Sequence, residues 1–89
     1  MPLISMFYGI VIQMYFFDTK QHHRAHFHAK YQNFSVTIAI DTGEVLEGKF
    51  PPAKLKLVDA WLEIHREDLM ADWQLAVEGG QVFQVEPLR

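Results

Sequence analysis

The sequence predicts an α+β fold: an antiparallel β-sheet of about four to five strands, with two helices from the C-terminal half of the chain packed on one face. Residues 1–50 hold segments with the two-residue alternation and the β-branched or aromatic content of strands, whereas residues 51–80 repeat apolar residues at helical spacing. Strands grouped before helices favour an antiparallel sheet over the βαβ order of parallel sheets. With 89 residues, the chain is expected to form a single domain, 1–89.

Four strands are expected in the first half of the chain. The first, residues 8–17, is apolar on both faces, which is typical of a central strand or of one covered on both sides. The second, residues 25–31, alternates between an apolar face and a polar face. The third, residues 34–40, leads through a turn at Gly43, which can adopt the positive φ that a tight hairpin needs. A short fourth strand at an edge of the sheet then starts at residues 44–46.

Two helices and a final strand are expected in the second half. A Pro-Pro pair at 51–52 opens the first helix, because proline is tolerated where the first N–H has no intrahelical partner. The second helix begins near the acidic pair at 67–68 and ends at the Gly-Gly pair at 79–80. Residues 81–87 then form a last short strand. The apolar positions of the two helices include Leu55, Val58, Leu62, Leu69, Met70, Trp73, Ala76 and Val77.

Several larger side chains of the helical region also have expected roles. Trp61 and Trp73 lie at helical spacing among leucines, so both are expected to pack in the core. His65 lies near the expected end of the first helix, where a partly charged imidazole interacts favourably with the helix dipole, so we interpret it as structural. Glu63 and Arg66 can form an ion pair at i, i+3.

Composition and charge narrow the classes of function. The chain has no cysteine, which excludes disulfides and thiolate metal sites and favours a reducing, cytoplasmic location. No signal peptide is expected, and the apolar run at residues 3–17 is too short for a membrane-spanning helix, so we expect no membrane partner. The net charge of −3 argues against general affinity for nucleic acid. Residues 1–40 nevertheless carry +2 and residues 41–89 carry −5, so part of the surface is expected to be cationic.

Four of the five histidines lie within seven consecutive positions. On the expected strand at 25–31, His26 and His28 point to the same outward face, with Cβ atoms about 6–7 Å apart given the rise per residue of a strand. Two imidazoles at this spacing can share one metal ion, and His22 or His23 from the preceding loop can supply a third nitrogen. The candidate metal ligands are therefore His22, His26 and His28, for a divalent metal such as zinc with one open coordination position.

Other interpretations of the same segment stay open. A neutral and a charged imidazole could transfer protons without a metal while a nearby cation holds a phosphate, as in RNA cleavage, with nucleic acid only as a substrate. The candidate catalytic residues are then His22, His26, His28 and Arg24. Alternatively, these side chains are simply the hydrated polar face of a half-buried strand. The chain could also be a pure interaction domain, a homodimer joined through the doubly apolar strand at 8–17.

Three stretches of the sequence carry a resemblance to a known family. They comprise Pro2, Ile4, Ser5, Phe7, Tyr8, Gly9 and Ile10; then His26, Phe27, His28 and Ala29; and finally Trp61, Glu63, His65, Arg66, Glu67 and Trp73. With these residues the chain resembles, over nearly its whole length, the small bacterial family of domains of unknown function numbered 4160. That family usually has Asp-His and then Pro-Pro before the His-Phe-His. Here Gln21 replaces the aspartate, and Arg24 and Ala25 replace the prolines, so the loop is expected to be less stiff.

The resemblance implies a role as well as a fold. Genes of this family commonly lie beside a second small gene, in the arrangement of a toxin–antitoxin module, with this family as the proposed toxin. It thus implies a partner, a small antitoxin protein, with the histidine-rich strand as the active or recognition surface. No reaction is attached to the family, so whether the chain is an enzyme stays open. The alternative is a metal-binding protein or nuclease-like hydrolase built on the same histidines.

Overall fold

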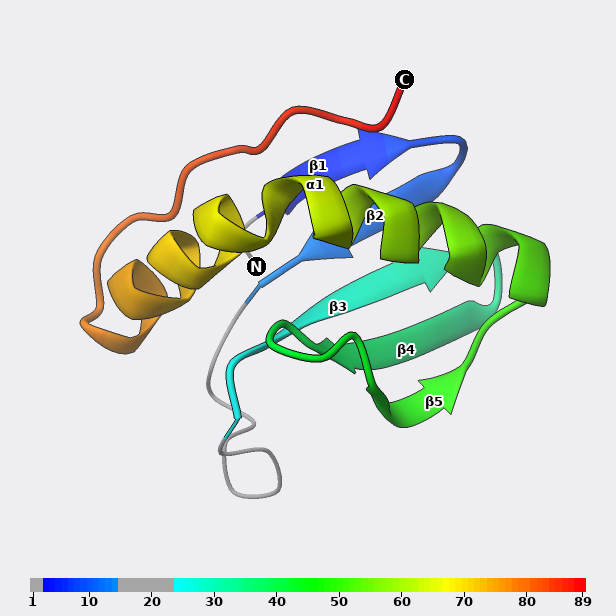
Figure 1. The fold of residues 1–89 in the computed structure, drawn as a ribbon, viewed down its shortest axis with the longest axis horizontal. Helices are drawn as coiled ribbons and strands as arrows, with labels where there is room; N and C mark the ends of the chain where they lie inside the picture. The colour runs from blue at the N-terminus through cyan, green and yellow to red at the C-terminus, as the bar shows by residue number, and fades with distance from the viewer. Residues whose placement is uncertain (1–2, 15–23) are drawn as a thin grey trace.

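The computed structural model describes residues 3–14 and 24–89, and in it a five-stranded sheet is covered on one face by one long helix (Figure 1). The elements are β1 (Leu3–Phe7), β2 (Ile10–Gln13), β3 (His26–Tyr31), β4 (Phe34–Ala39), β5 (Val45–Lys49) and α1 (Pro52–Val77). The strands lie side by side in chain order, and each is antiparallel to its neighbour. The expected α+β class and antiparallel sheet are therefore present, but the number of helices is not the expected one.

The N-terminal apolar stretch is a hairpin and not a single strand. Tyr8 and Gly9 connect β1 to β2 with φ angles of 51° and 80°. Positive φ at both central residues is the geometry of a type I′ turn, whose twist matches that of the flanking strands. The prediction of one strand from residue 8 is therefore wrong, because an apolar tyrosine in the turn hides the break. Residues 15–17 of the predicted strand lie outside the described residues.

The prediction of two helices is also wrong, because α1 continues for 26 residues. His65 has non-helical backbone angles (φ −116°, ψ 20°), which kink the helix at its middle without ending it. No glycine or proline lies between residues 53 and 78, so nothing in this stretch stops the helix. His65 is thus inside a helix and not at its C-terminus; its ring lies 5.8 Å from that of Trp61, and Nδ1 is 3.5 Å from Asp68. No helix of the described residues is both long and apolar enough to span a membrane.

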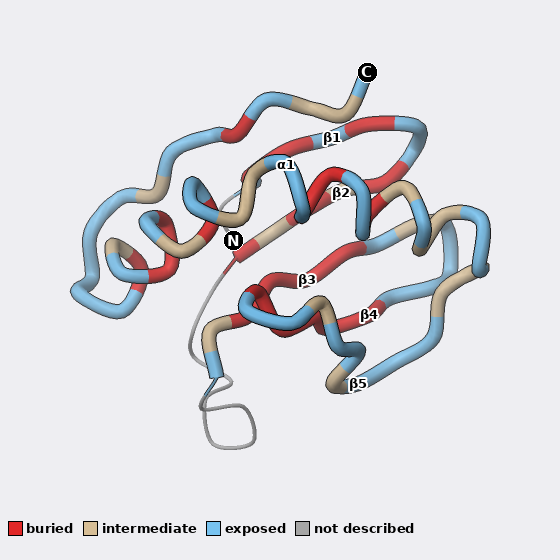
Figure 2. The backbone as a smooth tube through the Cα atoms, in the orientation of Figure 1, coloured by how far each residue is buried: buried red, intermediate tan, exposed pale blue. Residues whose placement is uncertain are grey.

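One apolar core lies between α1 and the sheet. The ring of Trp61 is 5.4 Å from Phe7 and 5.8 Å from Phe27, so this tryptophan joins β1 to β3. Trp73, further along the helix, is also buried, and the prediction that both tryptophans pack in the core is confirmed. Figure 2 shows buried positions along the strands and along both halves of the helix. The buried apolar residues of the sheet include Ile4, Ile10, Ile12, Ala29, Val36 and Ile38.

The C-terminal segment runs beside β1 in extended form (Figure 1). The N–H of Val85 donates to the carbonyl of Ile4 at 2.8 Å, and the indole of Trp61 donates to the carbonyl of Glu86 at 2.7 Å. These bonds attach the segment to both the sheet and the helix. The segment does not form the last strand expected at residues 81–87, because one ladder bond to β1 is too few to define a strand.

Candidate functional site

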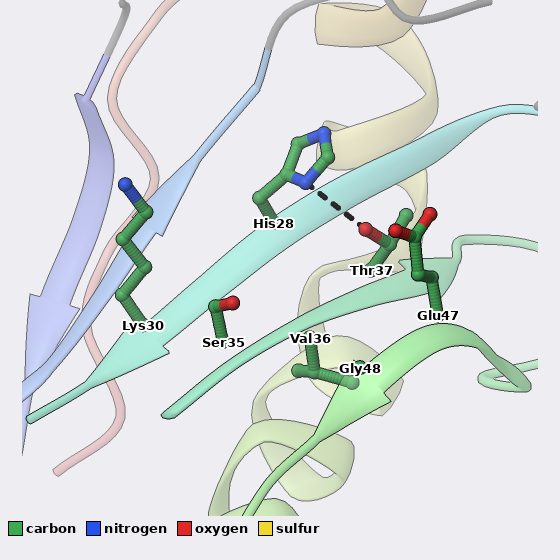
Figure 3. Close-up of a pocket in the computed structure, with 7 residues that line it drawn as sticks. All are labelled: His28, Lys30, Ser35, Val36, Thr37, Glu47 and Gly48. Carbon is green, nitrogen blue, oxygen red and sulfur yellow. Dashed lines mark hydrogen bonds between the residues drawn. The ribbon is translucent and has the colours of Figure 1, made fainter. Parts of the chain in front are cut away.

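The face of the sheet opposite α1 carries most of the polar side chains of the strands. Residues paired across antiparallel strands point to the same face, so the register defines this surface. We call it the helix-free face; it comprises Leu3, Met6, Val11, Gln13, His28, Lys30, Ser35, Thr37, Glu47 and Lys49. Figure 3 shows part of it, with the helix behind the sheet. The second strand therefore presents His28 and Lys30 on the polar face, as its alternation predicts.

A small pocket of about 110 Å³ lies on this face between β3, β4 and β5. Its wall is formed by His28, Lys30, Ser35, Val36, Thr37, Glu47 and Gly48 (Figure 3). Nδ1 of His28 lies 3.1 Å from the hydroxyl of Thr37, its cross-strand partner. Both side chains are buried, His28 with 8% of its surface exposed. This bond fixes the orientation of the imidazole. A ligand or a proton acceptor in the pocket would therefore contact a ring that is already oriented.

Gly48 shapes the wall of this pocket. Its φ of 93° belongs to the left-handed region, and a Cβ at this position would lie 2.2 Å from the carbonyl oxygen of Ser35. Only glycine therefore lets β5 approach β4 this closely. The ladder between the two strands also shifts register between Thr37 and Ile38, as a β-bulge does. The pocket thus depends on an irregular edge strand that periodicity alone does not reveal.

His26 is not on the outward surface, and the expectation that it is exposed is wrong. The side chain is fully buried; its ring lies 4.8 Å from Trp73 and, edge-on, 5.1 Å from His28. Its Nδ1 donates to the backbone carbonyl of Arg24 at 2.8 Å, since a carbonyl can only accept. One physical reason is the length of α1: because the helix continues past His65, Trp73 reaches the start of β3 and packs against the first histidine.

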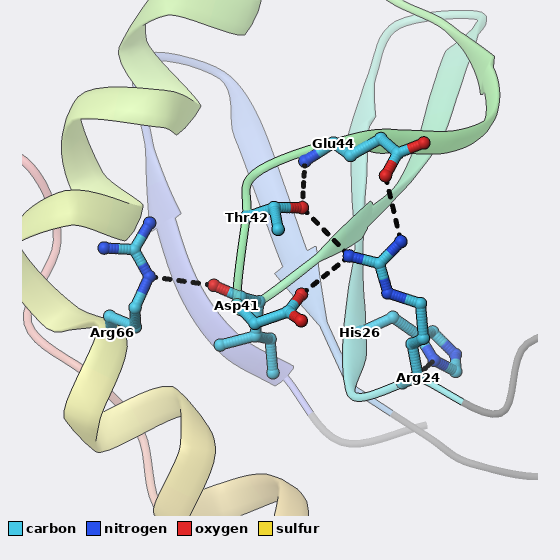
Figure 4. A network of polar contacts seen from close by, with 7 residues as sticks. Arg24, His26, Asp41, Thr42, Glu44 and Arg66 are labelled. Carbon is cyan, nitrogen blue, oxygen red and sulfur yellow. Dashed lines mark hydrogen bonds and ion pairs between the residues drawn. The ribbon is translucent and has the colours of Figure 1, made fainter.

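Arg24 is held by acidic side chains of the β4–β5 connection (Figure 4). Its guanidinium contacts Asp41 at 2.8 Å, Glu44 at 2.9 Å and the hydroxyl of Thr42 at 3.0 Å. The hydrogen bonds that Arg24 donates to Glu44 and Asp41 raise the pKa of Arg24, and the bond from Arg24 lowers the pKa of Asp41. The positive charge expected to hold a phosphate is therefore compensated within the fold. On the other side of this turn, Nε of Arg66 donates to the carbonyl of Ile40 at 2.9 Å.

The predicted histidine cluster is thus brought together only in part. His26 and His28 are neighbours, but each Nδ1 is bonded to a different partner, the Arg24 carbonyl for one and the Thr37 hydroxyl for the other. His22, the third candidate ligand, lies outside the described residues. Within residues 3–14 and 24–89, no three histidine or acidic side chains converge in a way that could hold a metal ion. A metal site would need a ligand from outside this part of the chain, such as His22 or His23, so this prediction stays open.

Comparison with known proteins identifies a family. The sequence model of a family described as a domain of unknown function (DUF4160) matches residues 9–74. This range includes β2 to β5 and most of α1, and therefore the whole of the pocket on the helix-free face. No curated protein and no solved structure matches the chain.

Proposed function

Because the chain belongs to the DUF4160 family of domains of unknown function, we propose that it is the toxin-like component of a two-gene bacterial module. In this proposal it acts in the cytoplasm and binds a small antitoxin protein through the helix-free face. The observation that carries the proposal is the pocket on that face, where the fixed His28–Thr37 pair lies between the opposite charges of Lys30 and Glu47.

The make-up of the helix-free face supports a protein partner. Apart from Gln13, its β1–β2 half is apolar, with Leu3, Met6 and Val11, and Met6 is 57% exposed. Its β3–β5 half is polar and carries charges of both signs. Stable interfaces combine apolar anchors with polar contacts, and the two halves of this face supply one each. The mixture of lysines and a glutamate gives too little positive charge for binding that depends on neutralising phosphates.

Co-expression with the product of the adjacent small gene tests the proposal. Expression of the chain alone should slow growth, and the second protein should relieve the effect and co-purify with it. Met6→Glu, which places a charge on the apolar half of the helix-free face, should prevent co-purification. Ile64→Glu is the matched control, because Ile64 is 66% exposed but lies on α1. If growth is unaffected and the two proteins do not co-purify, the proposal is wrong.

A second candidate is a metal-binding protein or nuclease-like hydrolase, and the polar pocket favours it. His28 would transfer a proton or ligate a metal, and Lys30 would hold a phosphate. Of the sequence-predicted catalytic residues, His26 and Arg24 are less suited, since one is buried and the other is ion-paired. Metal analysis of untagged protein, with His28→Ala and His22→Ala as variants, tests this function. Substoichiometric zinc that neither substitution changes would contradict metal binding.

A further inference from the structure

A second pocket lies away from the helix-free face, between the last turns of α1 and the C-terminal segment. It has a volume of about 320 Å³ and is lined by Asp68, Ala71, Asp72, Leu75, Phe83, Gln84 and Val85. This volume is at the lower end of the roughly 300–1,000 Å³ found for ligand pockets. We call it the C-terminal pocket. Because it uses none of the residues of the helix-free face, conclusions about it are independent of the proposed function.

The distinguishing feature of the C-terminal pocket is a buried carboxylate. Asp72 is only 3% exposed, and its Oδ1 accepts a hydrogen bond from the N–H of Phe83 at 2.9 Å. Its Oδ2 is also buried and has no hydrogen-bond partner within the described part of the chain. Burial raises the pKa of Asp72, and the nearby charge of Asp68 raises it further. The hydrogen bond from Phe83 lowers this pKa, but the net direction is upward. A buried carboxylate oxygen without a donor is costly, and a bound donor would remove that cost.

The rest of the pocket indicates what kind of donor fits. Ala71, Leu75, Phe83 and Val85 provide mainly apolar walls. A calcium ion takes about six to eight oxygen ligands and a magnesium ion keeps several of its waters, and the mainly apolar walls suit neither ion. An ammonium group on an alkyl stem fits both the carboxylate and the apolar walls. Its N–H groups donate to the carboxylate while its carbons contact the walls. A ring such as Phe83 adds attraction for a cation.

We propose that the C-terminal pocket binds an organic cation, a primary ammonium group carried on a short alkyl stem. The carboxylate of Asp72 accepts its hydrogen bonds, and Asp68 at the rim contributes a weaker, solvent-screened attraction. A free alkylamine and a lysine side chain share this chemistry, so the test begins with the simplest probe.

Titration of the ¹⁵N-labelled full chain with n-butylammonium chloride, followed by amide chemical shifts, tests the site. We expect saturable shifts confined to residues 68–75 and 83–85. Sodium chloride at equal ionic strength and n-butanol, the neutral analogue, should not reproduce them. Asp72→Asn keeps an oxygen acceptor for Phe83 but removes the charge, so binding should weaken by about tenfold or more. Asp68→Asn, at the exposed rim, should weaken it by less than about fivefold.

A second variant keeps the test decisive if Asp72→Asn does not fold. Ala71→Leu fills the pocket from an exposed helix position at little cost in helix propensity, and it leaves both carboxylates in place. It should abolish the saturable shifts. Butanol shifts equal to those of butylammonium, or wild-type affinity in either Ala71→Leu or folded Asp72→Asn, would overturn the proposal. If butylammonium binds, a lysine-containing peptide titrated in the same way establishes whether a protein side chain can also enter.

Discussion

The roles of individual residues follow from their surroundings more than from their type. His26 and His28 are two positions apart on one strand, yet Trp73 covers the first and Thr37 orients the second. Arg24 precedes the same strand, but two carboxylates compensate its charge. Alternation along the strand predicts which residues share a face. It cannot predict which of them a distant part of the helix will bury, because that contact depends on where the helix ends.

The bond between His28 and Thr37 is expected to stabilise the fold as well as to orient the imidazole. Thr37→Val keeps the shape of the side chain but removes the hydroxyl from a buried ring nitrogen. We expect the free energy of unfolding to decrease by about 1–3 kcal/mol, the usual cost of an unsatisfied buried polar group. Ser35→Ala, which removes an exposed hydroxyl from the same strand, should change it by less than about 0.5 kcal/mol. Urea denaturation of both variants measures the difference, and equal losses would show that the hydroxyl bond is unimportant.

Asp72 should make stability depend on pH in an unusual direction. Because burial raises its folded-state pKa above 3.8, the folded protein binds this proton at a higher pH than the unfolded chain does. The contribution of Asp72 to the unfolding free energy therefore decreases as pH rises from about 4 through the folded-state pKa. Asp72→Asn removes this contribution, so the variant should gain stability relative to the wild type as pH rises towards about 7.

Asp41→Asn provides a control of opposite sign. Arg24 lowers the pKa of Asp41, so the stability from this carboxylate is present above pH 3.8 and is lost as pH falls through the lowered pKa. Relative to the wild type, this variant should lose stability as pH rises. Denaturation of the three proteins between about pH 2 and pH 7 measures both trends, that of Asp41→Asn below about pH 4 and that of Asp72→Asn above it. The same trend in both variants would contradict the assigned directions.

Some features of the strands and the helix depend only on residues close together in the sequence, and these features could be predicted. Gly43, with a φ of 79°, marks the β4–β5 connection, and the predicted pair of Glu63 and Arg66 is present at 2.7 Å. Both depend on neighbours in the chain. The turn at Gly9 and the unbroken helix were not predicted, because an apolar run can contain a turn and a polar stretch such as residues 63–68 can continue a helix. Whether the chain turns at Gly9 or continues as a helix through residues 63–68 depends on which side chains are buried between the helix and the sheet.

Gly48 gives a test at the level of an element. Gly48→Ala places a Cβ against the carbonyl of Ser35 in a left-handed conformation, so we expect a loss of about 2 kcal/mol or more. Gly79→Ala is the matched control, because its φ of 79° is also in the left-handed region but no atom beyond its chain neighbours lies within 4 Å of the added carbon. It should cost only about 1 kcal/mol, the conformational part of the effect. Thermal unfolding compares the two, and equal losses would show that β5 does not approach β4 so closely.

In the molecule as a whole, α1 covers one face of the sheet and leaves the other uncovered, so the protein has two different surfaces. The helix-free face carries the His28–Thr37 pocket and apolar side chains of β1 and β2, whereas the helix side carries the C-terminal pocket with Asp72. Strand alternation indicated the first surface. The second could not be foreseen, because it forms where the C-terminal segment returns to the helix, and the contact between Asp72 and Phe83 spans 11 residues with no repeating pattern.

The most direct test of the proposed partner surface is hydrogen exchange of the chain, measured alone and with the product of the adjacent gene. We predict that the partner slows exchange in peptides from β1 to β5, and that this protection decreases in Met6→Glu but not in Ile64→Glu. Protection confined to α1, or no protection at a partner concentration that relieves the growth defect, would contradict the assignment of the helix-free face.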